Sequence, residues 1–519
     1  MASRDRLPEL LQDRGGGAAA EGAGRRRCRP PAGRATSCWL LALLVAAAAA
    51  PARGGGEAHF WPQARGLKGE YMLTNATLPR DLSSAFAWKF HHPESRFATV
   101  MRGNPLIDSQ KNVLILTEDG LFKLDQHGNV LWRYDRPTPA MIHIVPCIVD
   151  DVVYGMSHDT NVYALNLTTG EQLWLRKLGS LAGPDTAYVG AHGGVLLASV
   201  DASEPHGGGN LRVVGMNTSA DGDVLWELKI GLPTWNFNPL FPDDDSFIFM
   251  DVSGGVTRAN LHTGKVMWYA AVPDRYRYSF TDGGVMMSPD GSAAFACSNN
   301  EHDAVGALRA YRMADGTKLW DKPLPTGCTS WPVIARTGDW GVLPAGHFVS
   351  EPLLMKMPPW MPVWAKMKIH ELSLWLGEHM QKVLQWFPWY RVRSLHTEII
   401  AFDTRTGDTI WSYRTPDWRR MAAKGDEEGL VERVVRRRNF ICLPTSFGTP
   451  TLSGDDTVYV GHASGLLYAV KDHNGDGRID PDSEVSTFDM DAAPLPNNPA
   501  WAPGMMAVAS CDTLFVFKS

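Results

Sequence analysis

The sequence predicts an all-β protein made of repeated four-stranded sheets, and three observations support this prediction. A strand–turn–strand pattern ending in Trp recurs along the chain, and most intervals between these Trp residues are 42 to 52 residues, as in propellers and solenoids. The strands of each copy alternate apolar and polar residues, which gives a sheet one buried face. The 519 residues include 50 Gly and 35 Pro and are 44% hydrophobic, a composition that suits a folded chain rich in turns.

The clearest copy of the pattern, AFDTRTGDTIWSYRTP, runs from Ala401 to Pro416. We expect the Asp403 side chain to accept hydrogen bonds from backbone amides of the turn, and Gly407 to adopt the positive φ that other residues resist. The return strand then carries Trp411, which is wide enough to pack onto a neighbouring copy. Because one such sheet cannot bury both of its faces, the copies must stack, and a closed ring leaves no uncovered end.

The return strands of this kind number eight, with Phe488 in place of Trp in the last one. The final leading strand pair, from Met505, has no return strand after it, whereas Trp88 has no leading pair before it. We therefore expect the N-terminal strand to complete the C-terminal sheet, which gives an eight-bladed β-propeller over residues 84–519, or a seven-bladed one if a weak copy is misread. The predicted blade-packing residues are Trp88, Trp132, Trp174, Trp226, Trp268, Trp320 and Trp411.

The pattern formed by Ala401, Asp403, Thr406, Gly407 and Trp411 resembles the pyrroloquinoline-quinone-type (quinoprotein-like) repeat, from about Ser84 to Ser519. The resemblance implies a propeller fold but no single function. Members of that family include quinoprotein dehydrogenases, a bacterial outer-membrane assembly scaffold and lumenal domains of eukaryotic membrane proteins. In the dehydrogenases the quinone sits in the central channel, between a Trp and a disulfide of adjacent cysteines, with a calcium ion and an Asp base.

The chain departs from the dehydrogenase pattern. It has no Cys-Cys dipeptide, and no set of Asp, Asn and Glu can be placed on strands that face the channel. The motifs HExxH, GxSxG and GxxxxGK[ST], which mark other catalytic sites, are also absent. The sequence therefore predicts no catalytic or cofactor-binding residues and disfavours the quinone (PQQ) as a cofactor.

Residues 1–50 are interpreted as a leader. Arginines precede an apolar run from Cys38 to Ala50 of about 13 residues, which is shorter than the ~20 residues of a membrane-spanning helix. These features are typical of a secretory signal peptide cut near Ala50, with an uncleaved anchor or a two-part organelle signal as alternatives. Residues 51–83 are interpreted as a linker. The sequence thus predicts a lumenal or extracellular protein, and sequons that fit this location begin at Asn75, Asn166 and Asn217.

Charge and cysteine usage narrow the possible partners and sites. The chain has 50 basic and 56 acidic residues, and this mildly acidic balance is not that of a nucleic-acid-binding protein. Five cysteines lie beyond the leader, without a CxxC motif, so metal and redox motifs are not indicated. At most two disulfides can form, and small buried strand positions are favoured for most of these residues.

The segment DHNGDGRIDPDSE, from Asp472 to Glu484, has oxygen ligands at the spacing of a calcium-binding loop. The pattern is interrupted at position twelve, where Ser483 replaces the bidentate Glu and Glu484 follows one residue late. The sequence predicts a structural Ca²⁺ site in the turn between two strands, with a solvated acidic hairpin as the alternative. The predicted ligands are Asp472, Asn474, Asp476, Arg478 (through its carbonyl), Asp480 and Glu484.

Long insertions are predicted mainly on one face of the propeller. Residues 201–210, 299–306 and 350–396 separate second from third strands, and residues 417–439 link two blades. These connections emerge on the same face, whereas the calcium-like loop lies on the other. Loops on a rigid scaffold usually carry function, so the insertion face is the expected interaction surface.

The insertion of residues 350–396 is predicted to hold an amphipathic helix between Pro362 and Pro388. Its apolar stripe would comprise Ile369, Leu372, Leu376, Val383 and Phe387, with Met380 beside it. Three interpretations remain open: a lid packed on its own propeller, a surface for a partner protein, or a helix lying in a membrane surface. The Trp residues of this candidate interaction surface are Trp360, Trp364, Trp375, Trp386 and Trp389.

These features favour a non-catalytic binding scaffold in the secretory or endomembrane lumen, or outside the cell. It would engage a protein partner through the face that bears the insertion of residues 350–396. A quinoprotein-like oxidoreductase is the first alternative. A membrane-associated lumenal sensor or assembly subunit, in contact with a membrane surface, is the second.

Overall fold

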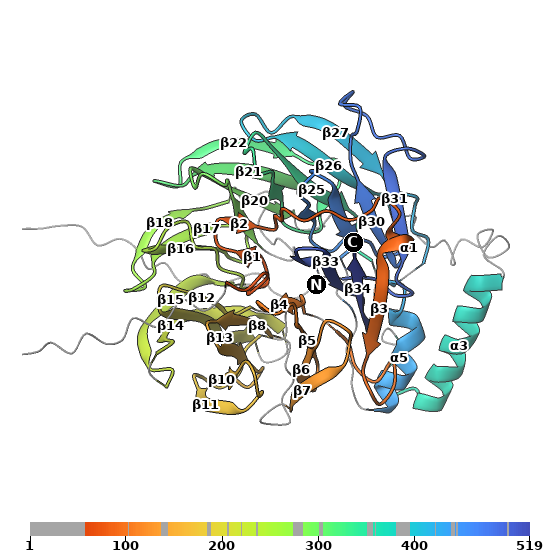
Figure 1. The fold of residues 1–519 in the computed structure, drawn as a ribbon, viewed down its shortest axis with the longest axis horizontal. Helices are drawn as coiled ribbons and strands as arrows, with labels where there is room; N and C mark the ends of the chain where they lie inside the picture. Colours follow the sequence, from red (N-terminus) through yellow and green to blue (C-terminus); the bar gives the residue numbers. More distant parts are fainter. Residues whose placement is uncertain are drawn as a thin grey trace, which may run out of the picture. The chain divides into compact units, whose positions relative to one another are not determined.

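The protein is described from a computed structural model, in which strands and turns make up most of the described chain. The described residues are 58–101, 103–135, 144–183, 188–204, 207–219, 221–234, 237–272, 284–299, 305–349, 357–358, 360–379, 395–420, 422–436, 442, 445–495 and 498–519. Eight antiparallel sheets follow one another around a common centre (Figure 1), so the predicted eight-bladed β-propeller is confirmed.

Blades 1 to 4 follow one another along the chain from Leu106 to Ala270. Blade 4 has three strands in the described residues, and Leu240 bridges Ile248 beside it. From the innermost strand outward, blade 1 comprises β4 (Leu106–Ile107), β5 (Val113–Thr117), β6 (Gly120–Leu124) and β7 (Val130–Asp135); blade 2, β8 (Ile144–Val149), β9 (Val152–Met156), β10 (Asn161–Asn166) and β11 (Gln172–Lys177); blade 3, β12 (Gly190–His192), β13 (Val195–Glu204), β14 (Gly207–Asn217) and β15 (Val224–Thr234); blade 4, β16 (Ser246–Met250), β17 (Val256–Asn260) and β18 (Val266–Ala270).

The other four blades complete the ring. Blade 5 comprises β19 (Val285–Met287), β20 (Ala293–Asn299), β21 (Gly306–Arg312) and β22 (Lys318–Pro323); blade 6, β23 (Gly327–Cys328), β24 (Val333–Ile334), β25 (Trp340–Gly346), β26 (Thr397–Asp403) and β27 (Thr409–Arg414); blade 7, β28 (Thr451–Leu452), β29 (Val458–Gly461), β30 (Leu466–Val470) and β31 (Val485–Asp489); blade 8, β32 (Ala500–Ala502), β33 (Met505–Ala509), β34 (Thr513–Lys518) and β3 (Phe86–His91).

The described residues outside the blades form a two-stranded ribbon and three helices. The ribbon consists of β1 (Gly66–Leu67) and β2 (Glu70–Tyr71), and the helices are α1 (Leu82–Ala85), α3 (Val363–His379) and α5 (Asp426–Val435). None of the described helices combines the length and the apolarity needed to cross a lipid bilayer.

The ring closes where the beginning and the end of the chain meet. Strand β3 pairs with β34 in antiparallel register, with Trp88 opposite Val516 and Phe90 opposite Leu514. The outer strand of blade 8 is thus N-terminal in the sequence, whereas its three inner strands are C-terminal (Figure 1). This confirms the predicted closure, which leaves no unpaired blade at either end of the ring.

Six of the seven predicted blade-packing Trp residues lie on a glycine turn of the next blade. The indole N–H of Trp132 donates to the Leu167 carbonyl at 3.1 Å, and a Cβ added to Gly170 would lie 2.7 Å from the Trp132 ring. Gly170 also has a φ of +73°, so both the space and the backbone conformation require glycine there. The same arrangement joins Trp88 to Gly128, Trp174 to Gly222, Trp226 to Gly264, Trp268 to Gly316 and Trp320 to Gly407.

Phe488 replaces Trp at the junction with blade 8, where no turn joins the third and fourth strands. The outer strand of blade 8 comes from the N-terminus, so no turn joins its third and fourth strands. Phe488 packs instead on Phe86 and Phe517, with ring centroids 5.8 and 5.0 Å away. An aromatic cluster therefore takes the place of the Trp–glycine contact at the closure.

One predicted insertion is a continuation of the sheet. Residues 201–210 were expected to separate two strands as a loop, but β13 and β14 extend through most of this range and pair up to Glu204 and Gly207. The backbone hydrogen bonds between β13 and β14 continue through this range, and they satisfy backbone groups that a loop would leave to water. The other insertions connect the strands that the sequence indicated, β20 to β21, β25 to β26, and β27 to β28.

The Trp–glycine contact predicts a position-specific cost of adding one methyl group. Gly170→Ala should lower the free energy of unfolding by about 2 kcal/mol more than Gly194→Ala, because overpacking adds to the backbone strain. Gly194 is a matched control, since its φ is +80° but nothing lies within 4 Å of an added Cβ. Urea denaturation of the two variants measures the difference, and equal losses would contradict the proposed role of the contact.

Candidate functional site

Residues 59–76, here named the axis segment, cross one end of the ring axis and contact seven blades. Trp61 exchanges backbone hydrogen bonds with Ile107 of blade 1, and Leu73 bridges Leu452 of blade 7. Figure 1 shows the ribbon β1–β2 of this segment near the middle of the ring. Further contacts reach Ile148 of blade 2, Ala191 of blade 3, Phe241 of blade 4, Val285 of blade 5 and Trp331 of blade 6.

The axis segment is part of the core, a role that the interpretation of residues 51–83 as a linker did not include. Trp61, Arg65 and Met72 are almost fully buried. The aromatic and apolar residues of HFWPQARGLKGEYML were the available signal, but they follow no strand period. Sequence reasoning therefore missed the group of residues that fills the ring.

Side chains occupy the centre of the ring. The Arg65 guanidinium lies 4.5 Å from the ring centre of Trp331, and Tyr188 meets Trp331 edge to face at 6.3 Å. The Tyr71 hydroxyl accepts the Phe241 amide at 3.0 Å, and burial raises the pKa of Tyr71. These residues come from the axis segment and from blades 3, 4 and 6, and all five are buried. The resemblance to the dehydrogenases would put a quinone in this channel, and the residues present do not fit one.

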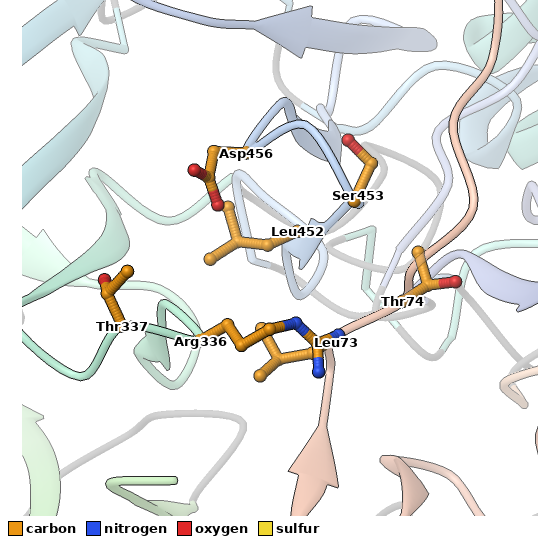
Figure 2. A pocket seen from close by; sticks show the side chains of 8 residues that line it. Leu73, Thr74, Arg336, Thr337, Leu452, Ser453 and Asp456 are labelled. Atoms are coloured by element: carbon orange, nitrogen blue, oxygen red, sulfur yellow. The ribbon is translucent and has the colours of Figure 1, made fainter.

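A cavity of about 210 Å³ lies beside Leu73 and Thr74 of the axis segment (Figure 2). Arg336 crosses its floor and pairs with Glu70 of the ribbon at 3.0 Å. Its other lining residues are Leu73, Thr74, Thr337, Leu452, Ser453, Gly454 and Asp456. The space is therefore a hollow of mixed polar and apolar lining between the axis segment and the turns of blades 6 and 7.

Helix α3 belongs to the connection between β25 and β26 and begins at Val363, directly after Pro362 as predicted. His370 is its one fully buried side chain in the described residues, and its Nε2 lies 2.9 Å from the Glu427 carbonyl of α5. Figure 1 shows α3 lying beside α5 at the margin of the ring. The predicted stripe residues Val383 and Phe387, together with Met380, lie outside the described residues.

The apolar residues of α3 face away from the propeller. Trp364 is 72% exposed, Leu372 55% and Trp375 52%, and Ile369 is also exposed. Within Val363–His379, apolar and polar side chains are not segregated onto opposite faces. The full predicted stripe extends beyond the described residues, so the amphipathic pattern stays a prediction. A lid packed on its own propeller would bury this surface, and the described part of the helix does not. Trp360 is also exposed, whereas Trp386 and Trp389 lie outside the described residues.

The calcium-like loop joins β30 to β31, the position of the glycine turn in other blades. Oxygens of Asp472 accept the amides of Gly475 and Gly477 at 2.7 and 3.0 Å. Asn474 and Asp476 accept the amides of Asp476 and Arg478. These contacts are turns in which Asp and Asn side chains bind nearby backbone amides, as the acidic-hairpin alternative requires.

Glu484 lies inside the loop. One carboxylate oxygen accepts the amide of Asp480 at 2.9 Å, and the other accepts the amide of His473 at 2.7 Å. These amides, that of Asp480 above all, hold the pKa of Glu484 below its usual value. Asp480 itself accepts the Ser483 hydroxyl at 2.6 Å. The calcium site therefore stays a prediction, with every acidic ligand already accepting hydrogen bonds within the loop or at Ser483.

The three sequons lie on the face that carries the turns from third to fourth strands. Asn166 and Asn217 are in the turns after β10 and β14, where each side-chain oxygen accepts a backbone amide. Asn75 follows the axis segment's pairing with Leu452 and is exposed. The axis segment and the calcium-like loop share this face, whereas α3 and α5 belong to connections on the opposite face.

Four of the five cysteines beyond the leader form disulfides, contrary to the expectation that most are simply buried strand residues. Cys297 of blade 5 is joined to Cys328 of blade 6, and Cys442 to Cys511. The second bond ties the connection that contains α5 to a turn of blade 8. Cys147 is unpaired and buried, and burial raises the pKa of its thiol.

Two clusters of potential metal ligands occur in the described residues, and both have structural explanations. Asp426, Cys442 and Cys511 gather around the second disulfide, and Asp426 pairs with the buried Arg433 at 3.2 Å. In the cluster of His92, Glu94 and Asp119, the His92 Nδ1 accepts the Glu94 amide and its Nε2 lies 3.3 Å from Asp119. This hydrogen-bond arrangement leaves the ring proton on Nε2, where a metal would need a lone pair.

A family model described as outer membrane protein assembly factor BamB matches residues 85–190. These residues comprise the closing strand β3 and blades 1 and 2. No curated protein matches the chain significantly.

Many solved structures share the fold. BamB from Moraxella catarrhalis aligns with a TM-score of 0.52 at 12% identity, over 84% of this chain and 99% of its own. A europium-containing methanol dehydrogenase aligns at 0.58 and 11%, over 90% and 99% of the two chains. Quinohemoprotein alcohol dehydrogenase from Comamonas testosteroni aligns at 0.56 and 11%, over 88% and 80%. Identities this low establish the fold and no activity. The resemblance to the pyrroloquinoline-quinone-type repeat is thus confirmed, and the chain has the fold of the PQQ-type β-propellers.

Proposed function

We propose that the protein is a non-catalytic β-propeller scaffold that binds a protein partner through the outward surface of α3. The observation that carries this proposal is the exposure of Trp364, Leu372 and Trp375 on a helix that is fixed to the ring. Large apolar side chains exposed together on one element commonly mark an interaction site. The partner would therefore offer an apolar groove that covers the side of α3 facing away from the propeller.

The energetics favour a protein contact at this surface. Burying one large apolar side chain contributes about 1.5–3 kcal/mol, and Trp residues are the commonest hot spots of protein interfaces. The scaffold also limits the entropy lost on binding. His370 holds α3 against α5. The disulfide between Cys442 and Cys511 ties the connection that contains α5 to blade 8.

Similarity of fold leaves a scaffold and an oxidoreductase as the two candidate functions, because BamB and the alcohol dehydrogenases share this propeller. The filled centre of the ring favours the scaffold. Arg65, Trp331 and Tyr188 occupy the place where the family resemblance would put a quinone. The matching family model describes an assembly factor, which supports a binding role by analogy alone.

A lumenal or extracellular location is part of the proposal. Two disulfides support an oxidising compartment, since such bonds are rare in the reducing cytosol. The sequons lie on one face of the propeller and α3 belongs to the other face. Glycans at the sequons would therefore not block the partner. The alternative to a protein partner is a membrane surface that contacts the exposed Trp residues of α3, because Trp also favours lipid interfaces.

The interaction surface predicts a specific loss of binding. Trp364→Ser combined with Trp375→Ser should weaken the affinity for the partner at least about tenfold, because each truncated hot spot costs more than about 1 kcal/mol. A photo-crosslinker at position 372 identifies the partner, and titration with that purified partner gives the dissociation constant. The melting temperature should not change, since both side chains are exposed.

Leu131→Ser combined with Leu173→Ser is a matched control, because these leucines are 51% exposed on the outer strands of blades 1 and 2. Affinity unchanged in the Trp double variant, or lost equally in the control, would contradict a protein site on α3. Liposome co-sedimentation that depends on the same two Trp residues, without a crosslinked protein, would favour the membrane alternative.

The filled ring centre predicts that the purified protein does not take up PQQ. With PQQ and Ca²⁺ in excess, we expect no stoichiometric change in the quinone absorbance spectrum after gel filtration, because Trp331, Tyr188 and Arg65 leave no channel for it. Stoichiometric uptake of the quinone would instead support the oxidoreductase.

Structural calcium in the loop of residues 472–484 is a further proposal, supported by the ligand spacing. If the site forms, Ca²⁺ should raise the melting temperature, and Asp472→Ala with Asp476→Ala should abolish that rise, because both remove carboxylate ligands. Asp315→Ala with Asp408→Ala is the control, since these residues lie in the corresponding turns of blades 5 and 6. No rise in the unaltered protein would leave the acidic hairpin as the correct interpretation.

A further inference from the structure

Arg65 places a positive charge at the centre of the ring. The residue comes from the axis segment, and only 2% of it is exposed. Its Nη1 donates to the carbonyl of Val285 in the innermost strand of blade 5. Its guanidinium lies over the ring of Trp331, from blade 6. Arg65 therefore joins the axis segment to two blades at once.

The guanidinium lacks an anionic partner among the described residues. Its Nε and Nη2 atoms are buried without a hydrogen-bond partner, and so is the indole N–H of Trp331 beneath it. The ionisable residues that influence the pKa of Arg65 are Tyr188 and Tyr71, not carboxylates. Burial raises the pKa of Tyr71, so that hydroxyl is neutral at physiological pH and supplies no counter-charge.

Arg65 stays charged despite its burial. Burial lowers the pKa of its guanidinium to about 9, which is still above neutral pH. A buried charge without a partner is strongly unfavourable, so buried charges in proteins are paired or bound to ions. Two other buried guanidiniums follow that rule, because Arg433 pairs with Asp426 and Arg258 pairs with Asp243. Arg65 has no such carboxylate partner among the described residues, so its counter-charge must come from elsewhere.

We propose that the centre of the ring binds a small monovalent anion, such as chloride, at the free N–H groups of Arg65 and at the indole N–H of Trp331. One negative charge balances the single guanidinium, whereas a divalent anion would leave an excess charge in a low-dielectric interior. The surrounding aromatic rings of Trp331 and Tyr188 favour a small ion over an organic one. The bound anion would neutralise Arg65 and so stabilise the packing of the axis segment against the blades.

Melting temperature in different salts tests this proposal on the full chain. The unaltered protein should melt about 2 °C or more higher in sodium chloride than in sodium gluconate at equal ionic strength, because chloride fits the site and gluconate is too large. Arg65→Met, which keeps the unbranched apolar stem of the side chain without the guanidinium, should melt at the same temperature in both salts. Arg336→Met should keep the chloride effect, since Arg336 is exposed at the edge of the axis segment and pairs with Glu70.

Bromide provides a direct measurement that does not depend on any variant folding. In crystals grown with sodium bromide, we expect an anomalous peak within hydrogen-bond distance of Nε or Nη2 of Arg65. Equal melting of the unaltered protein in chloride and gluconate would overturn the proposal. Bromide peaks confined to the surface, or a chloride effect lost equally in Arg336→Met, would do the same.

Discussion

The contact between a Trp of one blade and a glycine turn of the next is the interaction on which the ring depends. It recurs from Trp88 on Gly128 to Trp320 on Gly407. Each contact packs a large aromatic ring on the turn, and in five of the six the indole N–H also donates to a backbone carbonyl of that turn, as Trp226 does to Leu261 at 2.8 Å. Because the contact recurs at six of the eight junctions between blades, it sets the angle between neighbouring blades repeatedly around the ring.

Two junctions, at blades 7 and 8, lack the contact between a Trp and a glycine turn. At blade 8 the chain ends, so no turn is available and Phe488 packs into a cluster of phenylalanines. At blade 7 the glycine turn is replaced by the acidic loop of residues 472–484, in which a Cβ added to Gly477 would lie 3.3 Å from the backbone carbonyl of Ile410 in blade 6. The loop is thus part of the ring's packing whatever ion it holds.

Closure by the N-terminal strand also explains why the ring centre is filled. The chain must travel from its beginning to blade 8, and residues 59–76 make that passage across the axis, contacting the inner strands or the turns that follow them in seven blades. The same passage removes the channel that a quinone would use and brings Arg65 into the interior. Binding chemistry is therefore left to the connections on the insertion face, where α3 presents Trp364 and Trp375.

The sequence by itself determined the repeat, the number of blades and the closing strand, because alternation and Asx–glycine turns are local signals that each copy displays. It also determined where α3 begins, since Pro362 marks that boundary. Only the tertiary structure decided that residues 59–76 belong to the core, that Arg65 meets Trp331, and that the apolar residues of α3 face outward. The physical reason is that these contacts join residues far apart in the chain, and a periodic pattern states which residues share a face but not what that face meets.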